Sequence, residues 1–220
     1  MQIRGVLLDI DGTVVDTRPA YREANAHALG SGLVSVEDAQ MTRWMDEWVS
    51  LKDIIEELDL SEAVADVIRS MRRTRLVELL TEKKPWIPGA PELLTALKTA
   101  DTPRAFVTGA SRGHVNMLHE ILRFHDYIKE AVTEEDVNGR GKPDPHGLQM
   151  AADRLRVRRR HCLYLGNELV DVRAAKRAGM LACLVDTGKR DQFAVAECDE
   201  YFATLQEFHD FLKKRRLLTT

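Results

Sequence analysis

The sequence has neither an excess of one charge nor many cysteines. Its 220 residues include 32 lysines and arginines against 35 aspartates and glutamates, which gives a net charge of −3. Because this balance does not require a polyanionic partner, we expect no nucleic-acid ligand. The 3 cysteines cannot all pair. Two of them, Cys162 and Cys183, stand in apolar runs, which favours reduced thiols and a cytoplasmic location.

Long hydrophobic runs are also missing. Near the N-terminus only residues 6–8 are uninterrupted before the first aspartate, too few for the apolar region of a signal peptide. No later run approaches the ~20 apolar residues of a membrane span. We therefore expect no membrane association. With 44% hydrophobic and 30% charged residues, the chain has the composition of a folded globular protein.

Short apolar runs alternate with helical patterns through most of the chain. These runs, without polar alternation, are typical of strands buried on both faces of a parallel sheet; they are residues 6–8, 105–107, 162–165 and 181–185. Amphipathic helical patterns cover residues 91–99, 113–124, 145–155, 170–178 and 205–214. Strand and helix in alternation predict an α/β fold with a Rossmann-like, doubly wound parallel sheet.

One long segment has no strand-like run. Between Asp16 and about Lys84 the apolar residues recur at spacings of three and four, which predicts an inserted all-α unit. We place this helical cap at residues 16–87 and the core at residues 1–15 and 88–220. Trp44 and Trp48, one helical turn apart in the insert, are expected to pack inside it rather than to line a pocket.

Polar clusters follow the predicted strands. Ligands of open parallel sheets bind beyond the carboxyl ends of the strands, so these clusters mark a candidate site. They are Asp9 and Asp11 after the first strand, Thr108 and Gly109 after the second, Lys142 in a Gly-Lys-Pro turn, and Asn167, Glu168 and Asp171 after residues 162–165. The Thr108 hydroxyl, together with the backbone amides at the start of the next predicted helix, is suited to bind an anion. The carboxylate and amide oxygens that follow the first strand and residues 162–165 are suited to bind a hard cation such as Mg²⁺.

Other polar residues are explained by helix ends and surface positions rather than by a binding site. The basic cluster at residues 154–161 ends a predicted helix, where cations complement the helix dipole, and does not indicate nucleic-acid binding. The histidines His27, His114, His119 and His125 show no metal-ligand spacing and are expected to be structural or exposed.

The order of the clusters resembles a known family. A DxDGT sequence at residues 9–13, a hydrophobic run ending in Thr108, GKPDP at residues 141–145 and an acidic Gly-Asn loop resemble the haloacid dehalogenase superfamily. The chain is most similar to the branch of phosphoglycolate phosphatases and β-phosphoglucomutases, in which a helical cap follows the first strand. The resemblance implies a Mg²⁺-dependent phosphatase acting on a small phosphorylated metabolite, as a monomer or homodimer.

The same resemblance implies residue roles. Asp9 would be the nucleophile that forms an aspartyl-phosphate, and Asp11 the general acid and base, with its backbone carbonyl on the metal. Thr108 and the Gly109 amide would hold the phosphoryl oxygens, while Lys142 would neutralise both phosphate and nucleophile.

One position departs from the family pattern. The family commonly has Gly-Asp where this chain has Gly166 and Asn167. Asn167, Glu168 and Asp171 are therefore all candidates to complete the metal site, directly or through water.

Alternative functions remain open. A β-phosphoglucomutase-like phosphotransferase would use the same motifs, and a non-catalytic binding protein would account for Asn167. A dehalogenase is disfavoured, because that branch lacks the second aspartate present here as Asp11.

Overall fold

The computed structural model describes residues 2–47, 49–188 and 191–218. Within it the chain forms two compact units. A sheet unit comprises Met1–Asp16 with Trp86–Thr220, and a helical unit comprises Thr17–Pro85. The two units are described separately below.

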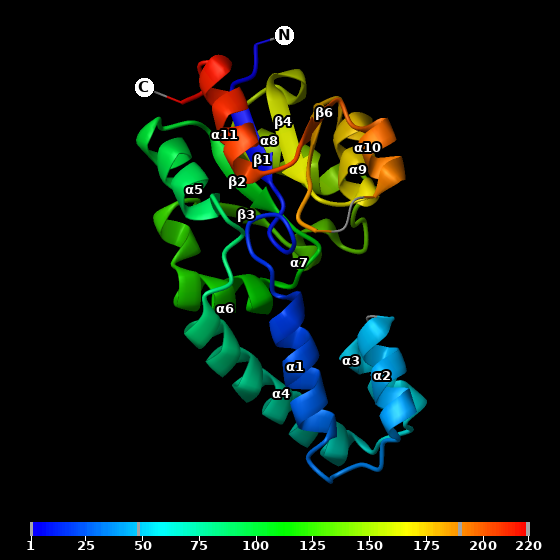
Figure 1. Cartoon of the computed structure of the whole chain (residues 1–220). Helices are drawn as coiled ribbons and strands as arrows, with labels where there is room; N and C mark the ends of the chain where they lie inside the picture. The colour runs from blue at the N-terminus through cyan, green and yellow to red at the C-terminus, as the bar shows by residue number, and fades with distance from the viewer. Residues whose placement is uncertain (1, 48, 189–190, 219–220) are drawn as a thin grey trace. The chain divides into compact units, whose positions relative to one another are not determined.

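A parallel sheet is the centre of the sheet unit (Figure 1). Among the described residues it has six strands in the order β3-β2-β1-β4-β5-β6. The strands are β1 (Gly5–Leu8), β2 (Arg104–Val107), β3 (Glu130–Val132), β4 (Cys162–Gly166), β5 (Leu181–Val185) and β6 (Glu200–Phe202). The predicted α/β fold with a doubly wound parallel sheet is confirmed.

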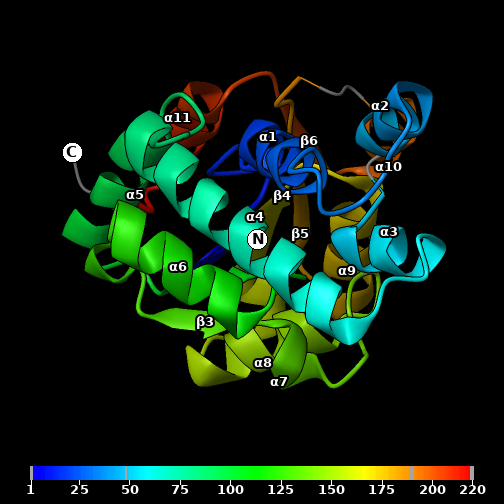
Figure 2. The same cartoon turned by 90° about the horizontal axis from the view of Figure 1, so that it is seen from below.

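Helices cover both faces of this sheet, which explains why β1 and β4 are buried along their whole length. Figure 2 shows α5 and α11 on one face and α8 and α9 on the other. The helices and short turns of the unit are α5 (Ala90–Thr99), α6 (Arg112–Leu122), η1 (Phe124–Asp126), α7 (Glu134–Val137), α8 (His146–Arg154), η2 (Arg159–His161), α9 (Leu169–Ala178), α10 (Gln192–Glu197) and α11 (Leu205–Lys214).

The strand order determines where a ligand site can form. From β1 the chain proceeds to β2 and β3 on one side, then returns to β4 on the other side of β1. The loops after β1 and β4 therefore leave the sheet in a crevice at a reversal of strand order, the usual ligand site of such folds. β1 and β4 pair from Gly5 with Cys162 to Leu8 with Leu165, so both strands end at the same level.

The helical unit contains α1 (Arg18–Leu29), α2 (Asp38–Asp46), α3 (Leu51–Glu57) and α4 (Glu62–Lys83). Trp44 is fully buried among apolar side chains, and its Nε1–H donates to Glu57 at 2.9 Å. The expected packing role of Trp44 is confirmed, whereas Trp48 lies outside the described residues. None of the helices in the described ranges, including the 22-residue α4, is long and apolar enough to cross a bilayer.

Two neighbouring segments join the helical unit to the sheet unit. Val15 forms an antiparallel bridge with Trp86, and the Ile87 N–H donates to the Val14 carbonyl at 3.0 Å. Gly89 then precedes the first residue of α5 with φ of 88°, a conformation that glycine adopts without steric cost. The outgoing and returning chains are thus held together within the sheet unit.

Candidate active site

Asp9 is the first residue after β1 and lies at the crevice between β1 and β4. Its backbone N–H donates to the Leu165 carbonyl at 2.9 Å, so the neighbouring strand fixes its position. The side chain is 7% exposed. A carboxylate buried this deeply needs a cationic partner, because unpaired burial of a charge is costly.

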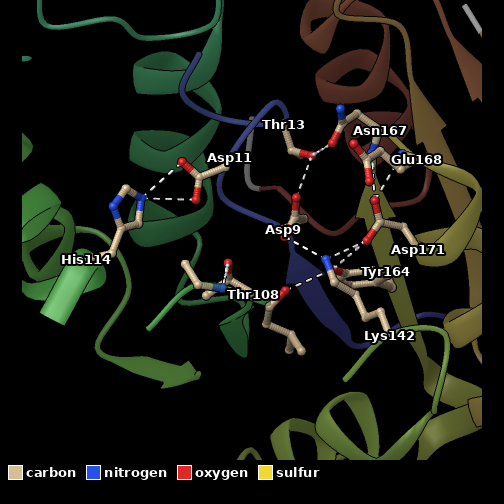
Figure 3. A network of polar contacts seen from close by, with 12 residues as sticks. Asp9, Asp11, Thr13, Thr108, His114, Lys142, Tyr164, Asn167, Glu168 and Asp171 are labelled. Atoms are coloured by element: carbon tan, nitrogen blue, oxygen red, sulfur yellow. Dashed lines mark hydrogen bonds and ion pairs between the residues drawn. The ribbon is translucent and has the colours of Figure 1, made fainter. Parts of the chain in front are cut away.

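Lys142 is that partner (Figure 3). Its Nζ lies 2.8 Å from Asp9 Oδ1, 2.6 Å from Asp171 Oδ1 and 3.1 Å from the Tyr164 hydroxyl oxygen. An ammonium group has three N–H donors, and these three acceptors use all of them. The lysine head group is therefore held at Asp9 by two neighbours that come from β4 and α9.

These contacts change the proton affinities of the site. Burial raises the pKa of Asp9 from 3.8 to about 7, although Lys142 opposes the rise. Burial disfavours the charged form of Lys142, but the two carboxylates of Asp171 and Asp9 outweigh it and raise the lysine pKa well above its usual value. Lys142 is therefore a permanent cation beside Asp9.

Tyr164 is a site residue that the sequence analysis missed. It is fully buried in the middle of β4, and its hydroxyl donates to the Val107 carbonyl at 2.8 Å. That donation leaves the oxygen free to accept from Lys142. Burial raises the tyrosine pKa well above 10, so the hydroxyl keeps its proton.

Asp171 and Glu168 both cap the start of α9. Asp171 Oδ2 accepts from the backbone N–H groups of Asn167 at 3.1 Å and Glu168 at 3.0 Å. The Glu168 side chain accepts from the Asp171 backbone in return, which completes a capping box. With its other oxygen on Lys142, Asp171 has both carboxylate oxygens engaged, and its role as a metal ligand stays a prediction.

Asn167 is the candidate ligand whose side-chain oxygen contacts the same hydroxyl group as Asp9. The Thr13 hydroxyl lies 3.1 Å from Asn167 Oδ1 and 3.4 Å from Asp9 Oδ2. One hydroxyl proton cannot fully satisfy both acceptors, so both oxygens keep spare lone pairs. Gly12, with φ of 80°, leaves room for this arrangement, because a Cβ there would lie 2.6 Å from the Asn167 amide nitrogen.

This donor set fits Mg²⁺. In the part of the chain described, no three His, Cys, Asp or Glu side chains gather as a metal cluster. Mg²⁺ does not need such a cluster, because it keeps several waters and takes one or two carboxylates together with substrate phosphate. Asp9, Asn167 and the Asp11 backbone carbonyl would supply oxygen donors, with a single negative charge among them.

Thr108 and Gly109 follow β2, the neighbour of β1 on the other side. Leu8 pairs with Phe106, so both strands end at the same edge of the sheet. The Thr108 hydroxyl accepts from the Ala110 N–H at 3.0 Å, and a Cβ at Gly109 would meet nothing within 4 Å. The backbone at Gly109 is therefore open to a close approach, as an oxyanion contact would require.

Asp11 does not join the lysine network. Its carboxylate points away from Asp9 and toward His114, whose Nε2 lies 3.0 and 3.1 Å from the two carboxylate oxygens (Figure 3). His114 was expected to be structural or exposed; its ring is 9% exposed and contacts the predicted site residue Asp11. It is the third residue of α6, and a helix that begins directly after the Thr108 loop brings its first turn to the site edge.

Known proteins are similar to this chain in sequence and in fold. A phosphoglycolate phosphatase from Nitrosospira multiformis is 28% identical over 226 residues and covers 97% of both chains. Hexitol phosphatase A from Escherichia coli is 29% identical over 181 residues, 81% of each chain. A crystal structure of a β-phosphoglucomutase-like protein from Thermotoga maritima superposes with a TM-score of 0.79 at 23% identity, covering 97% of this chain and 99% of that one.

The sequence model of the haloacid dehalogenase-like hydrolases matches residues 3–179. The matched range includes every predicted site residue from Asp9 to Asp171. Relatives of comparable length are named phosphatases, which confirms the expected enzyme class of phosphoric monoester hydrolases. Most of the chain is thus accounted for by one family, and the chain belongs to the haloacid dehalogenase-like hydrolases.

Proposed function

We propose that this hydrolase is a Mg²⁺-dependent phosphatase that cleaves a small phosphorylated metabolite through an aspartyl-phosphate on Asp9. The observation that carries the proposal is the buried contact of 2.8 Å between Asp9 Oδ1 and Lys142 Nζ. The Asp9 carboxylate, held beside the Lys142 cation at a ligand crevice, is suited to attack phosphorus.

Each residue of the site has a separate role in the proposed phosphoryl transfer. Asp9 Oδ1, the oxygen held by Lys142, is the one we assign to attack on phosphorus, while Oδ2 lies 3.4 Å from the Thr13 hydroxyl, which also contacts Asn167. Lys142 would also neutralise charge on the phosphoryl oxygens. The Thr108 hydroxyl and the Gly109 N–H would orient those oxygens in the in-line geometry that phosphoryl transfer requires.

Asp11 would move the protons. It would give a proton to the departing alkoxide, and later take one from the water that attacks the aspartyl-phosphate. When bound, Mg²⁺ would offset the repulsion between the Asp9 carboxylate and the phosphate dianion. Asp9, Asn167 and the Asp11 carbonyl are the groups we assign to hold it.

The helical unit, residues 17–85, is the part we assign as the cap. Its function would be to select the substrate, for which phosphoglycolate and sugar or hexitol phosphates are the candidates suggested by the named relatives. A cytoplasmic location and a monomeric or dimeric state stay predictions.

The test is hydrolysis of p-nitrophenyl phosphate with and without Mg²⁺, followed by a panel of small phosphate monoesters. Wild type should release phosphate only with the metal, and Asp9→Asn should release none. Isomerisation of a sugar phosphate without phosphate release would instead identify a β-phosphoglucomutase-like phosphotransferase. No Mg²⁺-stimulated turnover on any member of the panel would overturn the proposal.

A further inference from the structure

His114 makes a close contact with the proposed general acid and base. Its Nε2 lies 3.0 Å from Asp11 Oδ1 and 3.1 Å from Oδ2, and its ring is only 9% exposed. An ionised carboxylate can only accept hydrogen bonds, so the imidazole Nε2–H donates to both oxygens. A donor centred on both oxygens restrains the direction in which the carboxylate points.

The positions of both partners are fixed by their own segments. His114 belongs to the first turn of α6, and its backbone N–H donates to the Ser111 side chain that caps the helix. The loop that carries Asp11 is closed by a bridge from Asp11 to Val15 and by the Gly12 N–H, which donates to the Val15 carbonyl at 2.7 Å. His114 therefore contacts Asp11 from a defined location.

We propose that His114 is a positioning residue for Asp11, an inference that rests on the proposed phosphatase function. In-line displacement places the leaving oxygen on the far side of phosphorus from the Asp9 oxygen that attacks. A carboxyl group that protonates this oxygen must stand away from Asp9, with room for a phosphoryl group between them. Asp11 points in that direction, toward His114 (Figure 3).

The contact is compatible with both halves of the reaction. In the first half, the carbonyl oxygen of the protonated Asp11 accepts from His114, and its hydroxyl gives the proton to the leaving alkoxide as the P–O bond breaks. In the second half, the Asp11 carboxylate takes a proton from water as that water attacks phosphorus and the bond to Asp9 breaks. His114 donates to Asp11 in both halves, so it acts through Asp11 rather than on the substrate.

The test compares two leaving groups in a matched pair of variants. His114→Gln keeps an N–H near the position of Nε2, whereas His114→Asn places its N–H near the position of Nδ1. For the alkyl phosphate turned over fastest in the panel, kcat/KM should fall at least about tenfold in His114→Asn and recover most of that loss in His114→Gln. For p-nitrophenyl phosphate, whose leaving group departs as a stable anion, kcat/KM should change by less than about threefold.

Two further variants complete the design. His119→Ala, on the same helix, removes a ring whose Nδ1 accepts from the His125 N–H and should leave both substrates unaffected. In an Asp11→Asn background, His114→Asn should cause no further loss on the alkyl phosphate, because residues that act as a unit are not additive.

If His114→Asn loses equal factors of kcat/KM on both substrates, His114 only supports the fold. If kcat/KM on the alkyl phosphate is unchanged, the contact with Asp11 has no role. Additive losses with Asp11→Asn would also overturn the proposal. These failures are distinct from failure of the phosphatase function, in which wild type would not hydrolyse the panel or Asp9→Asn would stay active.

Discussion

Replacing Lys142 with methionine should lower the free energy of unfolding by roughly 3–5 kcal/mol, because it leaves buried carboxylates without their shared cation. Lys142 Nζ lies 2.8 Å from Asp9 Oδ1 and 2.6 Å from Asp171 Oδ1. Those side chains are 7% and 2% exposed, so solvent only partly compensates for the lost partner. Methionine fills a similar volume, and the variant therefore tests charge rather than packing.

The loss should also depend on pH. Burial already raises the pKa of Asp9 from 3.8 to about 7, so the folded carboxyl binds a proton at pH values where the unfolded one has released it. Stability from this group therefore falls as pH rises from about 4 to about 7. Without Lys142 the pKa rises further and the fall continues to higher pH. The variant should lose more stability at about pH 8 than at about pH 5.

Urea unfolding followed by far-ultraviolet circular dichroism, with EDTA present to remove metal, measures this loss. Asp171→Asn and the double variant complete a thermodynamic cycle, and the second substitution should recover part of the loss from the first. A coupling below about 0.5 kcal/mol would refute the reasoning. A loss of unfolding free energy in Lys142→Met that is equal at about pH 5 and about pH 8 would also refute it.

Three further predictions concern neighbouring residues. Tyr164→Phe removes an acceptor of Lys142 and should lower kcat on p-nitrophenyl phosphate roughly tenfold with little change in KM, and an unchanged kcat in steady-state assays would exclude the role. Asn167→Asp adds a carboxylate beside Asp9 and should lower the Mg²⁺ concentration for half-maximal activity about tenfold, whereas Glu168→Gln, a change at a helix cap, should alter it less than about twofold. If a Mg²⁺ titration instead shows a large change of this concentration in Glu168→Gln and little change in Asn167→Asp, Glu168 is the ligand. Burial disfavours the Asp136 carboxylate, but the Thr133 N–H and arginine side chains hold its pKa well below 3.8, so stability from it is present at neutral pH and lost as pH falls. The decrease in melting temperature caused by Asp136→Asn should therefore become smaller below about pH 4, and a decrease that is the same at every pH would contradict this assignment.

The central strands of the sheet could be predicted from the sequence because each is an uninterrupted apolar run. β3 and β6 were missed because they have three residues each, lie at the two edges of the sheet and include exposed or half-buried positions. So short a run with one polar residue is indistinguishable from a loop. Only pairing with β2 and β5 makes these segments strands.

The site could be predicted in part. Asp9, Thr108 and Asn167 follow apolar runs, and the parallel sheet brings such positions to one edge. Tyr164 was missed because in sequence it is one more apolar residue of β4, and its hydroxyl role depends on Val107 in another strand.

The role of His114 was missed for a related reason. The residue sits in the first turn of a helix, and sequence spacing does not show that this turn faces the loop after β1. The signal that could have found it is its position three residues after the capping Ser111, in the first turn of the helix that follows the Thr108 loop. For Glu168 and Asp171 the available signal was their spacing of three at the start of a predicted helix, which is that of a capping box.

Trapping of the covalent intermediate tests the central claim most directly. Enzyme mixed with Mg²⁺ and excess substrate carrying a radiolabelled phosphoryl group, then quenched in acid, should hold label in the peptide that contains Asp9. Borohydride should convert that residue to homoserine, and Asp9→Asn should hold no label. Turnover without label, or label that persists in Asp9→Asn, would contradict a mechanism through an aspartyl-phosphate on Asp9.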